Sequence, residues 1–146
     1  MYATTDEAIF TWMKDDSVIQ GLTGADGSDT RVYGNFPEQG VELTSSKPAF
    51  LIFSNEQDTP IGASTYGDEE LWQVRVFAED KETRDDIGKR IKKMAESLRY
   101  TGEFSFSDGR LQIQGGGFAS ISGRGFDEDL NAYVCNVRFT LLTILQ

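Results

Sequence analysis

Alternating hydrophobic and polar positions predict two half-buried strands, one in the middle of the chain and one at its end. Over residues 71–78, Gln73 and Arg75 separate apolar side chains that share the opposite face: Trp72, Val74, Val76 and Ala78. Residues 132–145 repeat this pattern, with one apolar face: Tyr133, Cys135, Val137, Phe139 and Leu141. Residues 49–54 are nearly all apolar, which predicts a strand buried on both faces.

Apolar residues at helical spacing predict a main helix over residues 82–98 and a short helix near the N-terminus. Asp80 is the expected N-cap of the main helix. Its apolar stripe consists of Ile87, Ile91, Met94, Ala95 and Leu98. We expect two i,i+4 ion pairs on it, Asp85 with Lys89 and Asp86 with Arg90. The short helix begins with a capping box, Thr4 with Glu7, followed on one face by Ala8, Ile9, Trp12 and Met13.

Turn-forming residues divide the remaining segments into a hairpin and two loops. Asp108-Gly109 is a strong hairpin signal, and a two-residue turn there pairs Phe104 with Ile113 and Phe106 with Leu111. Residues 55–68 contain no periodic apolar set and predict a loop of about a dozen residues, long enough to contact a partner. The glycine-rich residues 114–129 predict a mobile loop or a strand bulge.

These elements predict an α+β fold in a single domain that spans residues 1–146. We expect about five strands in a mostly antiparallel sheet, with the main helix packed on one face and the short N-terminal helix beside it. Residues 31–34 are expected to add a short extended piece. The longest apolar run, residues 141–145, is far shorter than the roughly 20 residues that span a bilayer, so we expect no membrane contact.

Composition and charge exclude several classes of function. The 146 residues contain 24 Asp plus Glu against 14 Lys plus Arg, a net charge of −10 that repels nucleic acid and makes sequence-specific binding unexpected. Histidine is absent, which excludes Ser-His-Asp and Cys-His nucleophilic sites and zinc sites with histidine ligands. Cys135 is the only cysteine, so the chain cannot form an intrachain disulfide, and we expect a buried, inert thiol.

No motif in the sequence assigns catalysis, a metal or a cofactor. The cluster from Gly115 to Ser120 fails the last position of GxGxxG, and Gly123-Arg124-Gly125 lacks the lysine of a P-loop. Asp127, Asp129 and Asn131 match the start of a calcium loop, but Ala132 replaces its glycine and Arg138 stands at its bidentate glutamate position. We therefore name no catalytic residue, no metal ligand and no cofactor, and we expect the protein not to be an enzyme.

The order of these elements resembles the tail completion, or tail terminator, proteins of long-tailed bacteriophages. This family includes the tail-to-head joining proteins of siphophages and their relatives in gene transfer agents. The likeness covers nearly the whole chain and rests on the N-terminal helix and four segments: Arg31-Val32-Tyr33, Ala49-Phe50-Leu51-Ile52, Leu71-Trp72-Gln73-Val74-Arg75-Val76-Phe77-Ala78 with its helix ending Met94-Ala95-Glu96-Ser97-Leu98, and the final strand.

The resemblance implies a structural virion protein in the tail or neck, assembled in the host cytoplasm. Such a protein forms a homo-oligomeric, typically hexameric ring that caps the tail tube, ends its polymerisation and docks to the head connector or stopper protein. Genomic DNA passes through the lumen only as cargo, and a negative wall would let it slide. Candidate residues for the lumen, the ring interface or a partner interface are Glu56, Asp58, Asp68, Glu69, Glu70, Arg75, Arg124, Asp127, Glu128 and Asp129.

Two alternatives remain open. The chain can be another head–tail connector or neck adaptor of the same particle, distinguished by the partner that it binds. It can also be a small soluble ligand-binding or hydrolytic α+β domain, which requires a pocket containing carboxylates with perturbed pKa values.

Overall fold

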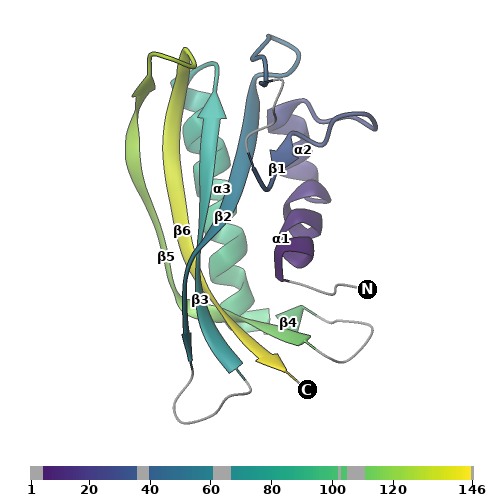
Figure 1. Ribbon diagram of the computed structural model, residues 1–146. Coiled ribbons are helices and arrows are strands. Elements are labelled where there is room, and N and C mark those ends of the chain that lie inside the picture. Colours follow the sequence, from purple (N-terminus) through teal and green to yellow (C-terminus); the bar gives the residue numbers. More distant parts are fainter. Residues whose placement is uncertain (1–4, 36–39, 61–66, 102, 105–110, 146) are drawn as a thin grey trace.

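A six-stranded sheet with helices against one of its faces makes up the described part of the chain (Figure 1). The computed structural model describes residues 5–35, 40–60, 67–101, 103–104 and 111–145. The helices are α1 (Thr5–Lys14), α2 (Ser17–Thr23) and α3 (Lys81–Thr101). The strands are β1 (Val32–Tyr33), β2 (Ala49–Pro60), β3 (Gly67–Ala78), β4 (Glu103–Phe104), β5 (Leu111–Asp127) and β6 (Ala132–Leu145).

The strands lie in the order β1-β2-β3-β6-β5-β4, and every pair is antiparallel except the short parallel pair of β1 with β2. The predicted α+β class, the mostly antiparallel sheet, the packed main helix and the short N-terminal helix are therefore confirmed. No helix among the described residues is long and apolar enough to cross a membrane.

The main core lies between the sheet and α3, where the two predicted periodicities meet. Alternate residues of β3 and β6 are buried beneath the helix: Trp72, Val74, Val76 and Ala78 from β3, and Cys135, Val137, Phe139 and Leu141 from β6. The predicted apolar stripe of α3 is buried against them. Asp80 caps this helix as predicted, because its carboxylate accepts a hydrogen bond from the backbone N–H of Thr83 at 2.7 Å.

Helices α1 and α2 lie beside α3 on the same side of the sheet (Figure 1). Ala8, Ile9 and Met13 of α1 are buried as predicted, whereas Thr4 of the expected capping box lies outside the described residues. Asp16 caps α2 through the N–H of Ile19. The guanidinium of Arg90 binds this same carboxylate, which joins α2 to α3. The predicted i,i+4 pair of Arg90 with Asp86 is therefore wrong.

The predicted loop over residues 55–68 is wrong, since most of it belongs to a long hairpin. β2 continues to Pro60 and β3 already begins at Gly67, and residues 61–66 lie outside the described ones. Residues 54–59 are exposed on both faces of this hairpin. A strand with no buried face has no hydrophobic alternation, so its pairing is carried by backbone hydrogen bonds that side-chain patterns do not reveal.

The glycine-rich segment is likewise a strand, β5, so its interpretation as a loop is wrong and that of a bulged strand is right. The pairing of β5 with β6 shifts between Gly115 and Ala119 and again between Ser122 and Gly125. The predicted pair of Phe104 with Ile113 is confirmed between β4 and β5. The turn at Asp108-Gly109 and the pairing of Phe106 lie outside the described residues.

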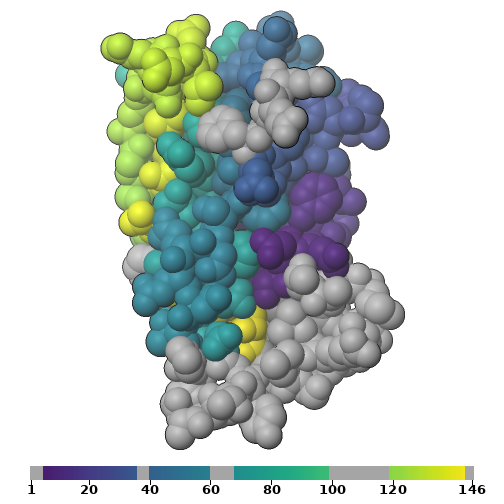
Figure 2. All heavy atoms as spheres, viewed as in Figure 1, coloured from purple at the N-terminus to yellow at the C-terminus, as the bar shows by residue number. Residues whose placement is uncertain are grey.

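The other face of the sheet is covered by no helix, and we call it the open face. Figure 2 shows this side, with β2 and β3 in the middle and β5 and β6 on the left. A small second cluster closes one end of it, where Val41 and Leu43 pack on Phe50, Ile52 and Phe77. Ala132 belongs to the same cluster, and the other open-face residues whose burial the structure describes near the middle of the sheet, such as Gln73, Arg75, Asn136 and Arg138, are exposed or half-buried.

Candidate functional site

The structure places the candidate residues at two opposite ends of the sheet rather than in one cluster. β6 pairs with Asp127 at its first residue, Ala132, and with Asp68 near its end, at Thr143. Eleven residues of strand separate these points, a distance of roughly 36 Å. The β2–β3 end holds Glu56, Asp58, Asp68, Glu69 and Glu70, and the β5–β6 end holds Arg124, Asp127, Glu128 and Asp129.

Glu70 is buried and has a structural role at the β2–β3 end. One carboxylate oxygen accepts a hydrogen bond from Trp72 Nε1 at 3.0 Å, and the other accepts one from the Thr5 hydroxyl at 3.2 Å. Burial raises the pKa of Glu70, and these hydrogen bonds only partly oppose that shift. Glu70 therefore fixes the start of α1 on β3, and no exposed lumen position remains for it.

The other acids of the β2–β3 end are accessible, and we call this group the acidic end: Glu56, Asp58, Asp68 and Glu69. Glu56 lies at the bulge of β2 and forms an ion pair with Arg138 Nε at 3.3 Å. Asp58 accepts a hydrogen bond from the side-chain amide of Asn55 at 2.8 Å. The acids project from the part of the hairpin in which residues 54–59 of β2 are exposed on both faces, so the acidic end is available to a partner.

Arg75 lies away from both ends, in the middle of the open face. Its guanidinium carbon is 5.4 Å from the centroid of the Phe77 ring, a cation–π distance. Its neighbours on this face include the apolar Ile52 and Phe77, and the polar side chains around it are Gln73, Asn136, Arg138, Ser120 and Ser122. The acid that contacts one of these polar residues is Glu56, which pairs with Arg138. The acidic excess therefore lies toward the β2–β3 end rather than around Arg75.

The two long outer strands leave open edges. β1 pairs with β2 only at Leu51 and Ile52, and β4 pairs with β5 only at Ile113 and Gln114. Beyond those pairs, the outer edges of β2 and β5 have no strand partner among the described residues. Exposed edges are templates for pairing with another chain. Both edges also contain bulges, which restrict the partners that such an edge accepts.

The acids of the β5–β6 end do not form an ion-binding cluster. Asp127 accepts a hydrogen bond from the N–H of Leu130 at 3.0 Å, which closes the turn. Glu128 and Asp129 lie exposed in that turn, and Arg124 lies 3.6 Å from the carboxylate of Asp85. In the part of the chain that the structure describes, no three acidic or thiol side chains are grouped as metal ligands.

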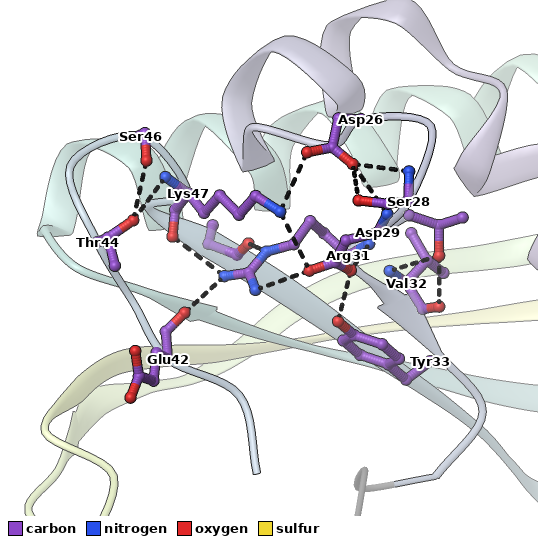
Figure 3. Close-up of polar contacts among 12 residues, drawn as sticks. Asp26, Ser28, Asp29, Arg31, Val32, Tyr33, Glu42, Thr44, Ser46 and Lys47 are labelled. Atoms are coloured by element: carbon purple, nitrogen blue, oxygen red, sulfur yellow. Dashed lines mark hydrogen bonds and ion pairs between the residues drawn. The ribbon is translucent and has the colours of Figure 1, made fainter. Parts of the chain in front are cut away.

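Sequence reasoning missed a buried arginine, Arg31, that organises the segment before β2 (Figure 3). Arg31 is 2% exposed and has a positive φ of 59°. Its guanidinium donates hydrogen bonds of 3.0 Å to the backbone carbonyls of Glu42, Lys47 and Ala49. No hydrophobic pattern in the sequence predicts this burial, since a single arginine between Thr30 and Val32 is expected to be exposed.

Carboxylates complete this network, which we call the Arg31 clasp: Asp26, Asp29, Arg31, Tyr33 and Lys47. Asp29 pairs with Arg31 at 3.4 Å and accepts a 2.7 Å hydrogen bond from the Tyr33 hydroxyl. Lys47 lies 3.1 Å from Asp26 and 3.6 Å from Asp29. Burial acts to raise the pKa of Asp29, but the hydrogen bonds from Tyr33 and Arg31 outweigh it and lower that pKa. Since the donors of the clasp bind groups of this chain, its role is structural.

Cys135 is buried beneath α3, as predicted. Burial raises the pKa of its thiol to about 11, so the thiolate is scarce at neutral pH. No family model and no curated protein matches the sequence.

Proposed function

We propose that this chain is a structural virion protein that forms a ring, caps the tail tube, ends its polymerisation and docks to the head connector. The observation that carries the proposal is the pair of open edges on β2 and β5. A chain with two different, complementary edges associates head to tail, and such contacts close into a ring when the rotation allows it.

The strand directions favour this closure. β2, β3, β6 and β5 alternate in direction, so the two outer strands run in opposite senses. A second copy that stands the same way up therefore brings its β2 edge antiparallel to the β5 edge of the first. This antiparallel pairing extends the sheet from copy to copy without a change of pattern.

The strand registers show which residues of the β2 edge and the β5 edge lie at the same height in the sheet. Ser54 lies opposite Gln73, Gln73 opposite Arg138, and Arg138 opposite Ser120. With no offset between copies, Ser54 of one copy faces Ser120 of the next. A closed barrel requires a stagger, and only steps of two residues keep the open face on the same side. The next pairing partner of Ser54 is therefore Ser122.

The charge distribution also supports a ring through which DNA passes. Head-to-tail closure places every acidic end at the same rim, so its carboxylates repel the phosphates of DNA there. The open face, or the helices, would line the lumen between the rims. In this proposal the partners are further copies of the chain, the tail tube protein and the connector protein, and the chain acts without enzymatic activity in the tail or neck.

The first experiment measures the solution mass by light scattering, with and without purified tail tubes, followed by negative-stain imaging. We expect sixfold rings, either free or only on the tube ends. A monomer or dimer that ignores the tubes contradicts the proposal. Rings that bind connectors but not tubes instead favour the neck adaptor, which shares the ring but not the partner.

Engineered cysteines test the edge contact directly, because the buried Cys135 does not compete. The double variants Ser54→Cys with Ser120→Cys, and Ser54→Cys with Ser122→Cys, sample the two registers. We expect one of them to give, on oxidation, a ladder of cross-linked species that ends at the ring size. The single Ser54→Cys variant is the matched control and should give no ladder. Rings that neither pair cross-links would show that another contact closes them.

A further inference from the structure

A pocket of about 500 Å³ lies at the β5–β6 end, next to the first turn of α3. It is lined by Lys81, Arg84, Arg124, Gly125, Phe126 and Tyr133. Two strands and a helix thus place three cations and two aromatic rings around one hollow, in a chain whose net charge is −10. The edge contact proposed above makes no use of this combination.

Tyr133 forms the centre of the pocket. Lys81 Nζ lies 5.7 Å and the guanidinium carbon of Arg84 lies 5.9 Å from the centroid of its ring. The ring of Phe126 meets Tyr133 edge-on, with the centroids 5.0 Å apart. The neighbouring side chains therefore hold the phenol ring in place. The pocket thus has a preformed apolar floor and positive charge at its border.

The three cations differ in what they already bind. Arg84 is buried, and it donates to the carboxylate of Asp85 at 3.0 Å and to the carbonyl of Gly125 at 3.2 Å. Arg124 is half exposed and shares that carboxylate at a longer distance, 3.6 Å. Lys81 has no ion pair among the described residues. Asp85 thus balances one of three positive charges, and Lys81 and Arg124 remain able to receive an anion.

Exposed apolar side chains lie in the pocket wall and in the turn beside it. Phe126 is 47% exposed and Leu130 is 41% exposed, and with Val18 they are the exposed large hydrophobic side chains of the described chain. Aromatic and arginine side chains that surround an exposed apolar patch are typical of the centres of protein interfaces. A small-molecule site usually encloses its ligand, whereas Phe126, which lines this pocket, remains exposed to solvent. The geometry therefore favours a segment of a protein.

We propose that this pocket is a docking site for a partner protein that presents an acidic segment with one large apolar side chain. The apolar side chain contacts Tyr133 and Phe126, and the flanking carboxylates contact Lys81 and Arg124. Charge complementarity selects this occupant, since the pocket gathers cations on a chain that is otherwise strongly acidic. The exposed acids Glu128 and Asp129 of the adjoining turn disfavour a partner segment with many more carboxylates. The inference does not require the ring.

The test is a fluorescence anisotropy titration of the full-length chain with a fluorescein-labelled peptide, Gly-Ser-Asp-Leu-Asp-Ser-Gly, at moderate salt. We expect saturable binding. Phe126→Ala, and Lys81→Ala combined with Arg124→Ala, should each weaken it about tenfold, the loss expected for interface anchors. Arg75→Ala is the matched control, because it removes a cation that lies over a phenylalanine outside the pocket, and it should change binding less than twofold. A peptide with serine in place of leucine should bind at least about tenfold more weakly.

Several results overturn the proposal: no saturable binding by the native chain, equal binding of the serine peptide, or binding that Phe126→Ala leaves unchanged. Circular dichroism of each variant confirms that it is folded, which the exposure of Phe126 and Arg124 leads us to expect. Concentration-dependent self-association that Phe126→Ala abolishes would assign the pocket to the acidic end of a second copy instead. A monomer that ignores the tail tubes but binds the peptide contradicts the ring alone, and a ring that ignores the peptide contradicts the pocket alone.

Discussion

The Arg31 clasp and the pocket at the β5–β6 end are built from the same kinds of side chain and reach opposite results. Each contains a buried arginine, an aspartate that accepts from it, a lysine and a tyrosine. In the clasp the arginine donates to three carbonyls, the tyrosine hydroxyl binds the aspartate, and the lysine has two carboxylates. In the pocket the tyrosine presents its ring and the lysine has no ion pair among the described residues.

This difference separates a structural network from a binding surface. A polar group whose hydrogen-bond partners lie in its own chain stabilises the fold. A cation beside an exposed ring costs little free energy when it has no ion-pair partner, and it is available to a ligand. The comparison predicts that equivalent substitutions affect stability strongly in the clasp and weakly in the pocket. Stability is measured below by urea unfolding at fixed protein concentration, with the fluorescence of buried Trp72 as one signal.

Arg31→Met should give the largest loss of stability, about 3 kcal/mol, because it removes a buried charge, leaves three carbonyls without their donor and removes the ion pair of Asp29 with the guanidinium. Arg75→Met is the matched control on the open face and should cost less than about 0.5 kcal/mol. Equal losses for the two variants would show that the clasp does not hold segment 40–48 in place.

Arg84→Met tests the buried arginine of the pocket and should cost less, about 2 kcal/mol. Methionine keeps the apolar stem beneath Tyr133, and the freed Gly125 carbonyl lies on an exposed part of β5 where water replaces the lost donor. A loss equal to that of Arg31→Met would contradict the claim that the pocket is the less closed of the two networks.

How far the sequence predicted these regions depends on whether burial leaves a pattern. β3, β6 and α3 each bury one face, so their hydrophobic periodicity predicted their type and most of their bounds, although β3 begins at Gly67 rather than at Leu71. Residues 54–59 of β2 and residues 122–126 of β5 are exposed, so they show no hydrophobic alternation. The sequence therefore predicted a loop for the first segment and left a loop or a bulged strand open for the second. The clasp is the extreme case, since the burial of Arg31 depends on carbonyls from residues 42–49 that only the fold brings near.

The candidate site shows the same limit. The sequence identified the acidic residues but placed them on two loops as one set, whereas the register of β6 puts them at opposite ends of the sheet. The open edges that carry the proposed function follow from strand order, which no local pattern encodes. The pocket is formed by the start of α3, the end of β5 and the start of β6. Of its lining residues, Arg124 was the one that the sequence analysis proposed as a candidate site residue.

Asp29→Asn should cost about 1 kcal/mol at pH 7 through weakened charge-assisted hydrogen bonds in the clasp. The pKa of Asp29 is lowered in the folded state, so its stabilising effect is complete above the unfolded value near pH 4 and is lost as the pH falls through the folded value. The difference between native and variant chains should therefore shrink below about pH 4. A difference that persists at pH 2 would mean that the carboxylate charge is not its source.

Lys81→Met should have the smallest effect on stability, less than about 0.5 kcal/mol, because Lys81 has no ion pair among the described residues and its apolar stem is conserved. Its counterpart in the clasp, Lys47→Met, removes contacts to Asp26 and Asp29 and should destabilise the chain more. The order of the two effects reverses for binding of the acidic peptide. Lys81→Met should weaken this binding several-fold and make it less dependent on salt, whereas Lys47→Met should leave it unchanged. The two lysines thus form a crossed pair of controls. If Lys81→Met were the more destabilising of the two, the lysine of the pocket would be a structural residue and the contrast between the regions would fail.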